Sequence, residues 1–308
     1  MTATKIPVVL LALLHSTLAL FIHSKDGTQL WAEAKGDTSK PGVVWLHGYP
    51  SSSIVFDEYF EDEDYLSQFH MVRYDIRGMG QSDKPSDPAA YHPERFSEDF
   101  DAVVQAFNLH KPCVVGWSSI SHDIYEYHGH GYISGFIYMA SFHHPAKTGD
   151  FTYPERVPMY YKMLDTSNVT AFLEGADEFV DSLLAHPDDI PWKTRMLWTS
   201  LVTTVPQSVS YLLLFRDQPG TRLLDEGAPV LPVLYIEAAK DSIINNSAII
   251  ETTFRPKFKK LEVLTIPDAG HAAFLHGYKE IKEGIVQFVN KVTKEEEHAG
   301  GSPSHIEL

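Results

Sequence analysis

Residues Pro112–His122 read PCVVGWSSISH, and the architecture expected for the rest of the chain follows from them. A short apolar run leads into Gly116, Trp117 and Ser118, and the residues that follow can continue as a helix. A strand that turns sharply into a helix, with a serine at the turn, is a nucleophile elbow. The turn lifts the serine hydroxyl above the sheet, and the pattern G-x-S-x-G keeps strand and helix close together. Gly116 fits that pattern, whereas Ile120 stands where its second glycine is expected.

Length and composition limit the possible domain organisation, partners and cysteine chemistry of the chain. The 308 residues, 44% of them hydrophobic, suffice for one large domain or one domain with an insertion. A net charge of -16 leaves no basic surface to neutralise phosphates, so nucleic acid is not an expected partner. The single cysteine, Cys113, excludes an intramolecular disulfide and a thiolate metal site.

Histidines are numerous, sixteen in all, and five lie near one another in sequence: His122, His128, His130, His143 and His144. Their spacing matches no metal-ligand pattern, so solvated loop and helix-end histidines are the expected reading. We expect neither a metal nor a cofactor.

Buried strands alternate with helices along most of the chain. Such alternation predicts a doubly wound, mostly parallel sheet with right-handed crossovers, an α/β fold. A hairpin that turns at Asp26-Gly27 is expected over Phe21–Ala34. The other expected strands are Val43–Leu46, a strand from Met71, Cys113–Val115, Tyr132–Phe142, Val233–Ile236 and Leu261–Ile266, and the clearest helices are Glu94–Leu109 and the one that carries Tyr278, Ile281, Ile285 and Phe288.

The alternation stops between His143 and Gly227. Helical patterns at Ala171–Leu184 and Val209–Phe215 are separated by prolines, and no buried strand is evident. We therefore predict a helical cap over residues 143–227, inserted into a core formed by residues 20–142 and 228–293.

A serine hydroxyl is a weak nucleophile until a histidine accepts its proton and a carboxylate orients that histidine. In a doubly wound sheet these groups sit at the carboxyl ends of strands. Asp241 follows the strand VLYI, and His271 follows LEVLTI. The order Ser118, Asp241, His271 is that of one class of hydrolases.

With these residues in place, the chain resembles the α/β-hydrolase superfamily. His47-Gly48-Tyr49-Pro50 is similar to its HGxP oxyanion loop, and Asp75–Ser82 resembles its D-x-R-G-x-G-x-S segment. The resemblance covers roughly Phe21–Val292, and the cap is matched by position only. It implies that Ser118 is nucleophile, His271 base and Asp241 acid, and that the N–H groups of Tyr49 and Ser119 are the oxyanion donors.

A serine rather than an aspartate at position 118 implies an acyl-enzyme. The leading reading is a capped serine hydrolase for a small or medium, largely apolar ester or lactone. Carbon–carbon bond cleavage or perhydrolysis on the same triad is the alternative enzyme class, and a non-catalytic binding protein that kept the fold is the third reading. Candidates for the substrate pocket are Phe172, Trp192, Met196, Trp198 and Tyr211.

The two ends of the chain carry address signals. Residues 1–19 resemble a secretory signal peptide, and the stretch is too short and interrupted to predict a stable membrane span. The tail 294–308 is expected to be disordered and ends in HIEL, which resembles an endoplasmic-reticulum retention signal. Asn168 and Asn245 begin glycosylation sequons. A lumenal enzyme is one expectation, and a cytoplasmic one with a chance tail is the other.

Ile120 adds a branched side chain where the elbow pattern wants none. Ile120, Ile124 and Tyr127 share a helical face, so a buried stripe and a helix displaced from the sheet are expected. This displacement predicts a slow enzyme rather than an inactive one.

Overall fold

A single sheet organises the protein. The structure is a computed structural model that describes residues 18–118, 123–142 and 151–300. Within these residues, eight strands pair in the order β1-β2-β4-β3-β5-β6-β7-β8. Strand β2 runs antiparallel to β1 and β4, and all pairs from β4 to β8 are parallel. The strands are β1 (Leu18–His23), β2 (Gln29–Lys35), β3 (Gly42–Leu46), β4 (His70–Tyr74), β5 (Cys113–Trp117), β6 (Gly135–Met139), β7 (Val233–Ala238) and β8 (Leu261–Ile266).

The expected α/β class and its parallel sheet are confirmed. The continuous apolar runs form the centre of the sheet, because strands covered on both faces have no side for polar residues. Every residue of β5 and β6 is buried, and Leu46 at the end of β3 pairs with Gly116 near the end of β5. This register brings the loop after β3 beside the elbow.

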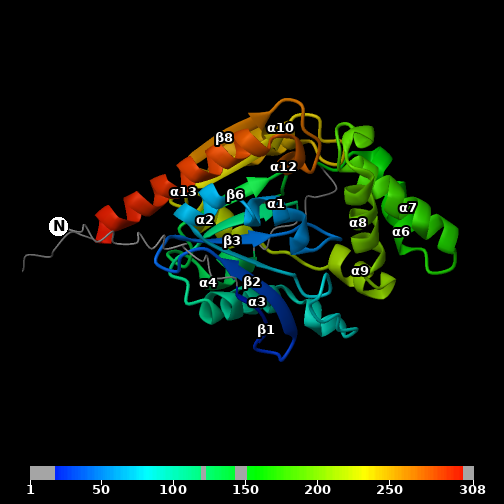
Figure 1. Cartoon of the computed structure of the whole chain (residues 1–308), viewed down its shortest axis with the longest axis horizontal. Coiled ribbons are helices and arrows are strands. Elements are labelled where there is room, and N and C mark those ends of the chain that lie inside the picture. Colours follow the sequence, from blue (N-terminus) through cyan, green and yellow to red (C-terminus); the bar gives the residue numbers. More distant parts are fainter. Residues whose placement is uncertain (1–17, 119–122, 143–150, 301–308) are drawn as a thin grey trace, which may run out of the picture.

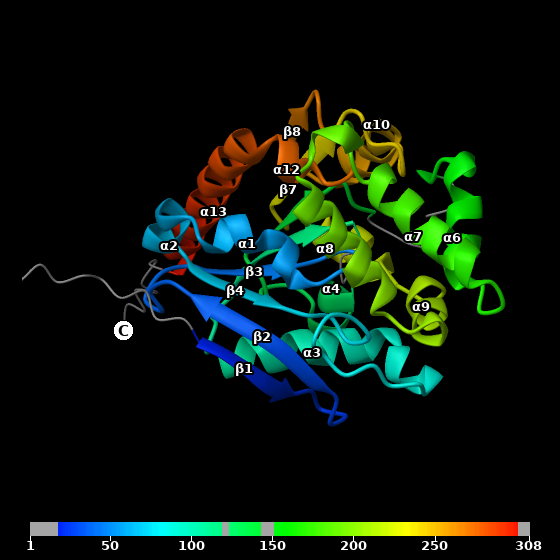
Figure 2. The ribbon, with the colours of Figure 1, turned by 45° about the vertical axis from the view of Figure 1, so that its right-hand side comes forward.

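Helices cover both faces of the sheet. In Figure 2, α3 and α4 lie on one face, and α2 and α13 lie on the other. Helix α3 buries Phe96, Phe100 and Val103 at helical spacing, which is the face predicted from the sequence. Outside the 151–227 segment, the helices are η1 (Ser53–Phe56), α1 (Asp57–Phe60), α2 (Glu63–Gln68), η2 (Pro88–Tyr91), α3 (Pro93–Ala106), α4 (Asp123–His128), α10 (Asn246–Ile249), η7 (Ile250–Phe254), α11 (Arg255–Lys257), α12 (Ala273–His276) and α13 (Tyr278–Gly300).

Helices α6, α7, α8 and α9, within residues 157–214, form a group at one end of the molecule (Figure 1), whereas η6 contacts α4. The two helices expected there from the sequence correspond to α7 and α9. Thr152 makes one isolated β-bridge, to Ile244. The predicted cap also includes residues 143–150, which lie outside the described residues. The helices are η4 (Pro154–Arg156), α6 (Val157–Leu164), α7 (Val169–Ser182), η5 (Pro187–Asp189), α8 (Trp192–Thr203), α9 (Gln207–Leu214) and η6 (Leu223–Gly227).

The prediction of disorder from Lys294 onward is wrong as far as Gly300, because α13 continues to that residue. Lys294 and the three glutamates after it are strong helix formers. Glu295 and Glu296 also lie beside Lys260 and Lys111, at 3.5 and 3.4 Å. Residues 301–308 lie outside the described part of the chain.

The first strand overlaps the predicted signal peptide. Strand β1 begins at Leu18, and Leu18 and Ala19 pair with Ala34 and Glu33. Cleavage of the leader expected over residues 1–19 would thus remove the first two residues of β1. Residues 1–17 are not described. In the described ranges, no helix combines the length and the apolar character needed to cross a bilayer.

Candidate active site

Ser118 occupies a strained turn directly after β5. Its φ is +61°, in the left-handed region that side chains other than glycine rarely adopt. The turn is held because β5 lies between β3 and β6 and because the N–H of Ser118 donates to the carbonyl of Met139 at 3.0 Å. Strain of this kind, stored at a strand-to-helix turn, is the geometry of a nucleophile elbow.

His271 and Asp241 lie in line with that serine. The Oγ of Ser118 is 2.9 Å from Nε2 of His271, and Nδ1 of His271 is 2.8 Å from Oδ2 of Asp241. The loops that carry them, after β7 and β8, are joined by hydrogen bonds from Ala239 N to Ile266 O and from Lys240 N to Ala269 O. Ser118, His271 and Asp241, separated by 153 and 30 residues in the sequence, therefore form one hydrogen-bonded row of side chains.

Asp241 is held from several directions. Its Oδ1 accepts from the N–H groups of Ile243 and Ile244, at 2.8 and 3.0 Å. Its Oδ2 accepts from Asn246 as well as from His271. Hydrogen bonds from N–H groups suit a carboxylate, which accepts through both oxygens.

The His47–Pro50 loop lies against the serine. A Cβ on Gly48 would lie 2.9 Å from Cβ of Ser118, so only glycine allows this approach. Nε2 of His47 accepts from Ile76 N at 3.0 Å, which leaves Nδ1 to donate to Gly48 O at 2.9 Å. Burial lowers the pKa of His47, in keeping with this neutral tautomer.

This loop places the main chain of Tyr49 one residue from the contact with Ser118. Among the described residues, the N–H of Tyr49 makes no hydrogen bond, as expected of a donor kept for an oxyanion. Ser119, the other predicted donor, and Ile120 lie outside the described residues. Ile124 is buried, but Tyr127 is 43% exposed, so the expected buried stripe through Tyr127 is wrong. Within the described residues, helix α4 spans Asp123–His128, and its Tyr127 faces solvent.

Trp117, the residue before Ser118, contacts His271. Its indole Nε1 donates to the carbonyl oxygen of His271 at 2.9 Å, and the two rings lie 5.9 Å apart. The indole also meets the ring of Phe274 edge-on at 5.0 Å. No role for Trp117 follows from the sequence alone, because the bond joins positions 154 residues apart.

We expect Trp117→Phe to lower kcat by about tenfold with little change in KM, because an unpaired carbonyl and a displaced base weaken proton transfer. Steady-state kinetics on a chromogenic ester measure both. Trp45→Phe is the matched control, since Trp45 is equally buried on β3 and its Nε1 has no partner in the described residues. Equal losses in both variants would show a general effect of trimming a buried tryptophan.

Of the pocket candidates, Trp198 packs against Trp117, the residue before Ser118. It is buried, and its ring lies 6.2 Å from Trp117 and 6.0 Å from Phe274. Helix α8 therefore contacts the end of β5. Ala272 N also donates to Leu183 O at 2.8 Å, so the chain after α7 contacts the loop of His271.

The other four candidates lie differently. Trp192 is 74% exposed, and Tyr211 is 56% exposed and packs on the ring of Phe215 at 4.7 Å. Met196 is 37% exposed, and Phe172 is half-buried. No hydrogen bond or ring contact joins these four residues to Ser118 or His271 in the described part of the chain.

A buried ion pair ties α4 to the segment after α9. Asp123 Oδ2 lies 2.8 Å from Arg216 Nη1, and the guanidinium lies 3.8 Å from the centre of the Phe96 ring. Burial raises the pKa of Asp123 to about 6 even though Arg216 acts to lower it, and Glu126 raises it further. The folded protein thus holds this proton more tightly than the unfolded chain does.

It follows that ionised Asp123 destabilises the fold at neutral pH, and that this penalty is relieved as the pH falls through about 6 towards the ordinary value of 3.8. Relative to Asp123→Asn, the wild type should gain about 2 kcal/mol of unfolding free energy between about pH 7 and about pH 4.5. Urea titrations at both pH values measure the gain. Parallel pH dependences in the two proteins would contradict the buried, titrating carboxyl.

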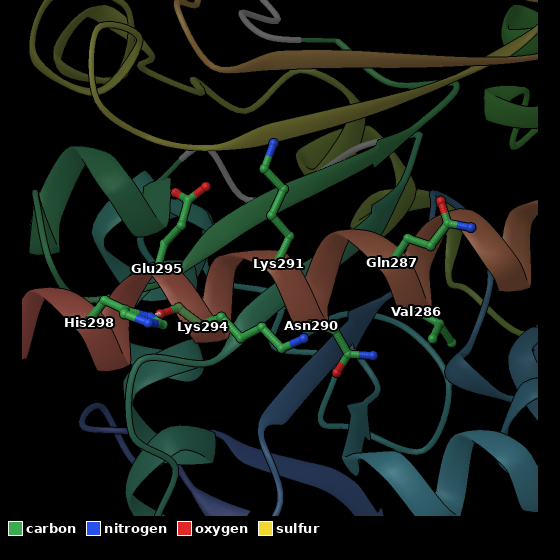
Figure 3. Close-up of a pocket in the computed structure, with 7 residues that line it drawn as sticks. All are labelled: Val286, Gln287, Asn290, Lys291, Lys294, Glu295 and His298. Carbon is green, nitrogen blue, oxygen red and sulfur yellow. Dashed lines mark hydrogen bonds between the residues drawn. The ribbon is translucent and has the colours of Figure 1, made fainter.

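A groove on helix α13 contains none of the predicted site residues (Figure 3). It is lined by Val286, Gln287, Asn290, Lys291, Lys294, Glu295 and His298. No cluster of three metal-ligating side chains occurs within residues 18–118, 123–142 and 151–300. His128 there stacks on Tyr132, and His122, His143 and His144 lie outside those ranges.

Comparisons with known proteins find the same fold. Residues 41–119 match the family model described as alpha/beta hydrolase fold. AB hydrolase superfamily protein YisY of Bacillus subtilis is 23% identical over 279 residues, 88% of this chain and 98% of that protein. The esterase RhEst1 from Rhodococcus sp. ECU1013 superposes with a TM-score of 0.78 at 19% identity, over 89% of this chain and 99% of that one.

A third similarity is shorter. The probable oxidoreductase EphD of Mycobacterium tuberculosis is 32% identical over 113 residues, 36% of this chain. The match spans only 18% of the length of EphD, so it extends over one part of that protein.

Proposed function

Because the chain has the fold of α/β-hydrolases and matches their family model over residues 41–119, we propose that it is a serine hydrolase for a small or medium, largely apolar carboxylic ester or lactone. The observation that carries the proposal is the unbroken row from Ser118 Oγ through His271 to Asp241, at 2.9 and 2.8 Å. Such a row converts a hydroxyl into a nucleophile. The aromatic rings of Trp117, Trp198 and Phe274 beside it favour an apolar substrate.

In the first half of the reaction, Ser118 Oγ attacks the ester carbonyl carbon while its proton passes to Nε2 of His271. Asp241 stabilises the imidazolium that forms. The N–H of Tyr49, with that of Ser119, receives the negative oxygen. The intermediate then collapses, and the alcohol leaves with the proton from Nε2.

In the second half, a water molecule gives a proton to Nε2 of His271 and attacks the acyl-enzyme. The second tetrahedral intermediate collapses, Ser118 recovers its proton, and the carboxylic acid leaves. A lactone follows the same steps, except that its alcohol and acid remain parts of one molecule. Atoms and charges balance without a metal or redox partner.

The proposal is tested with a fluorophosphonate probe and a panel of nitrophenyl esters and lactones that differ in acyl length. We expect stoichiometric labelling of Ser118 and a preference for one range of chain lengths. Labelling without ester or lactone turnover would favour the alternative chemistries on the same triad, carbon–carbon cleavage or perhydrolysis. An unlabelled, folded protein would favour the binding-protein reading.

The cellular address is a separate proposal. We propose a lumenal location, supported by the terminal signals and by the exposure of Asn168, which begins a sequon at the start of α7. A tagged protein in the secretory pathway should change its electrophoretic mobility on endoglycosidase treatment. An insensitive protein in the cytosolic fraction would favour the cytoplasmic alternative.

A further inference from the structure

The side chain of Asn246 is hydrogen-bonded to the carboxylate of Asp241. Asn246 is the first residue of α10, and only 3% of its surface is exposed. Its Nδ2 donates to Asp241 Oδ2 at 2.8 Å. That oxygen is also the one that lies 2.8 Å from Nδ1 of His271. Two donors thus bind the same oxygen of Asp241. The position of Asn246 therefore affects how that oxygen is oriented toward His271.

The orientation of the Asn246 amide is fixed by its neighbours. Its Oδ1 lies 2.9 Å from the hydroxyl of Tyr235, which is also 2.9 Å from the carbonyl oxygen of Ser141. Burial raises the pKa of Tyr235 well above its ordinary value, so this hydroxyl keeps its proton. Turned over, the amide would set its oxygen against the Asp241 carboxylate, and two acceptors would face each other.

These contacts close a ring back to the nucleophile. The hydroxyl of Ser141 donates to the carbonyl oxygen of Ser118, and its own carbonyl faces Tyr235. The ring therefore links the ends of β5, β6 and β7 with the start of α10 and the loop of His271. Its members, in order, are Ser118, His271, Asp241, Asn246, Tyr235 and Ser141.

We propose that Asn246 is a positioning residue for the reaction: its amide holds the Asp241 oxygen toward His271, and the Tyr235–Ser141 link keeps the acid aligned with the nucleophile. The inference rests on the proposed function, because it assigns Asn246 a part in the same proton transfer. Asn246 touches no reacting atom. Its effect passes through Asp241 and His271, so it should appear in kcat rather than in KM.

The first test compares Asn246→Ala with Asn245→Ala on a nitrophenyl ester. Asn245 is the matched control, because its side chain caps α10 through Ala248 N at 3.0 Å and is not hydrogen-bonded to Asp241. We expect Asn246→Ala to lower kcat by about tenfold to hundredfold with KM within about twofold. Asn245→Ala should keep both constants. Wild-type kcat in Asn246→Ala would overturn the proposal.

The second test uses a pH profile that a purely structural role would not change. Asn246→Asp is nearly isosteric, and its new carboxyl can donate to Asp241 only while it is protonated. Once ionised, it repels Asp241 and removes the donor. We therefore expect the kcat of this variant to fall, relative to that of the wild type, as the pH rises. A wild-type pH profile in Asn246→Asp would also overturn the proposal.

A third measurement does not depend on turnover. The His271 Nδ1–H proton, bonded to Asp241, should give a low-field proton resonance that is identified by its loss in His271→Ala. We expect this resonance to move in Tyr235→Phe, which removes one hydroxyl, and to stay in place in Asn245→Ala. If circular dichroism shows that both Asn246 variants are unfolded, the position of this resonance in Tyr235→Phe is the test of the proposal. An unmoved resonance in Tyr235→Phe would overturn the ring.

These outcomes separate the two ideas. A folded wild type that neither hydrolyses esters nor reacts with the phosphonate would sink the proposed function. The resonance and its response to Tyr235→Phe would still report on the contact among Asn246, Asp241 and His271.

Discussion

Ser118→Ala should lower ester hydrolysis by about 10⁴- to 10⁶-fold without unfolding the protein. In the proposed mechanism Ser118 supplies the attacking oxygen, and no other hydroxyl in the described residues is hydrogen-bonded to His271. Alanine tolerates the same space, so the strained turn with φ of +61° should persist. Initial rates at saturating ester, with phosphonate labelling alongside, measure the loss.

Two further variants sharpen this result. His271→Ala, alone or combined with Ser118→Ala, should fall to a similar residual rate, because members of one catalytic unit do not contribute additively. Ser97→Ala is a control, since Ser97 is a buried serine on α3, apart from the ring around Ser118. Substantial turnover by Ser118→Ala would refute the acyl-enzyme mechanism.

Asp75→Ala should cause the largest loss of stability, about 3–5 kcal/mol. Asp75 is fully buried just after β4. Its Oδ1 accepts from Ser52 Oγ and from both N and Oγ of Ser53, at 2.7–2.8 Å, and its Oδ2 accepts from Gln81 N at 2.8 Å. Removing the carboxylate would leave these buried donors unpaired.

The same carboxylate joins two loops, the one that holds Tyr49 and the one at residues 76–82. Activity should therefore decline together with stability. Urea titration and ester turnover on the same preparation measure both. Asp37→Ala is the matched control: Asp37 also accepts a backbone N–H, from Ser39 at 2.9 Å, but is exposed and should change stability by less than about 1 kcal/mol. Equal losses in the two variants would contradict the role of burial.

The sheet could be predicted from the sequence, and so could the proximity of Ser118, Asp241 and His271, for a physical reason. Strands buried on both faces must be continuous apolar runs, so β3, β5 and β7 stand out without any knowledge of their partners. Functional side chains of a parallel sheet lie in the loops after the strands, which is where Asp241 and His271 are found, after β7 and β8. The second glycine of Asp75–Ser82 has a structural reason as well. A Cβ on Gly80 would lie 2.1 Å from Asp75 Oδ2.

What the sequence could not supply were contacts made only in three dimensions. The indole of Trp117 and the amide of Asn246 have no periodicity or spacing that links them to His271 and Asp241. The tail was misjudged because composition signalled disorder, whereas pairing with Lys111 and Lys260 continues α13. By residue type alone, Trp192 and Trp198 are equally good candidates for the pocket. Only the structure shows that Trp192 is exposed and Trp198 is buried.

The strand order also fixes when the site can exist during synthesis. Strand β5 pairs with β3 and β6, so the turn that holds Ser118 is supported once the chain has emerged past β6. The base follows 153 residues after the nucleophile, beyond the last strand. Because domains fold as they leave the ribosome, a nascent chain carries the serine long before anything can activate it. Translation products that stop before β8 should therefore be chemically inert, with the edge of β7 left uncovered.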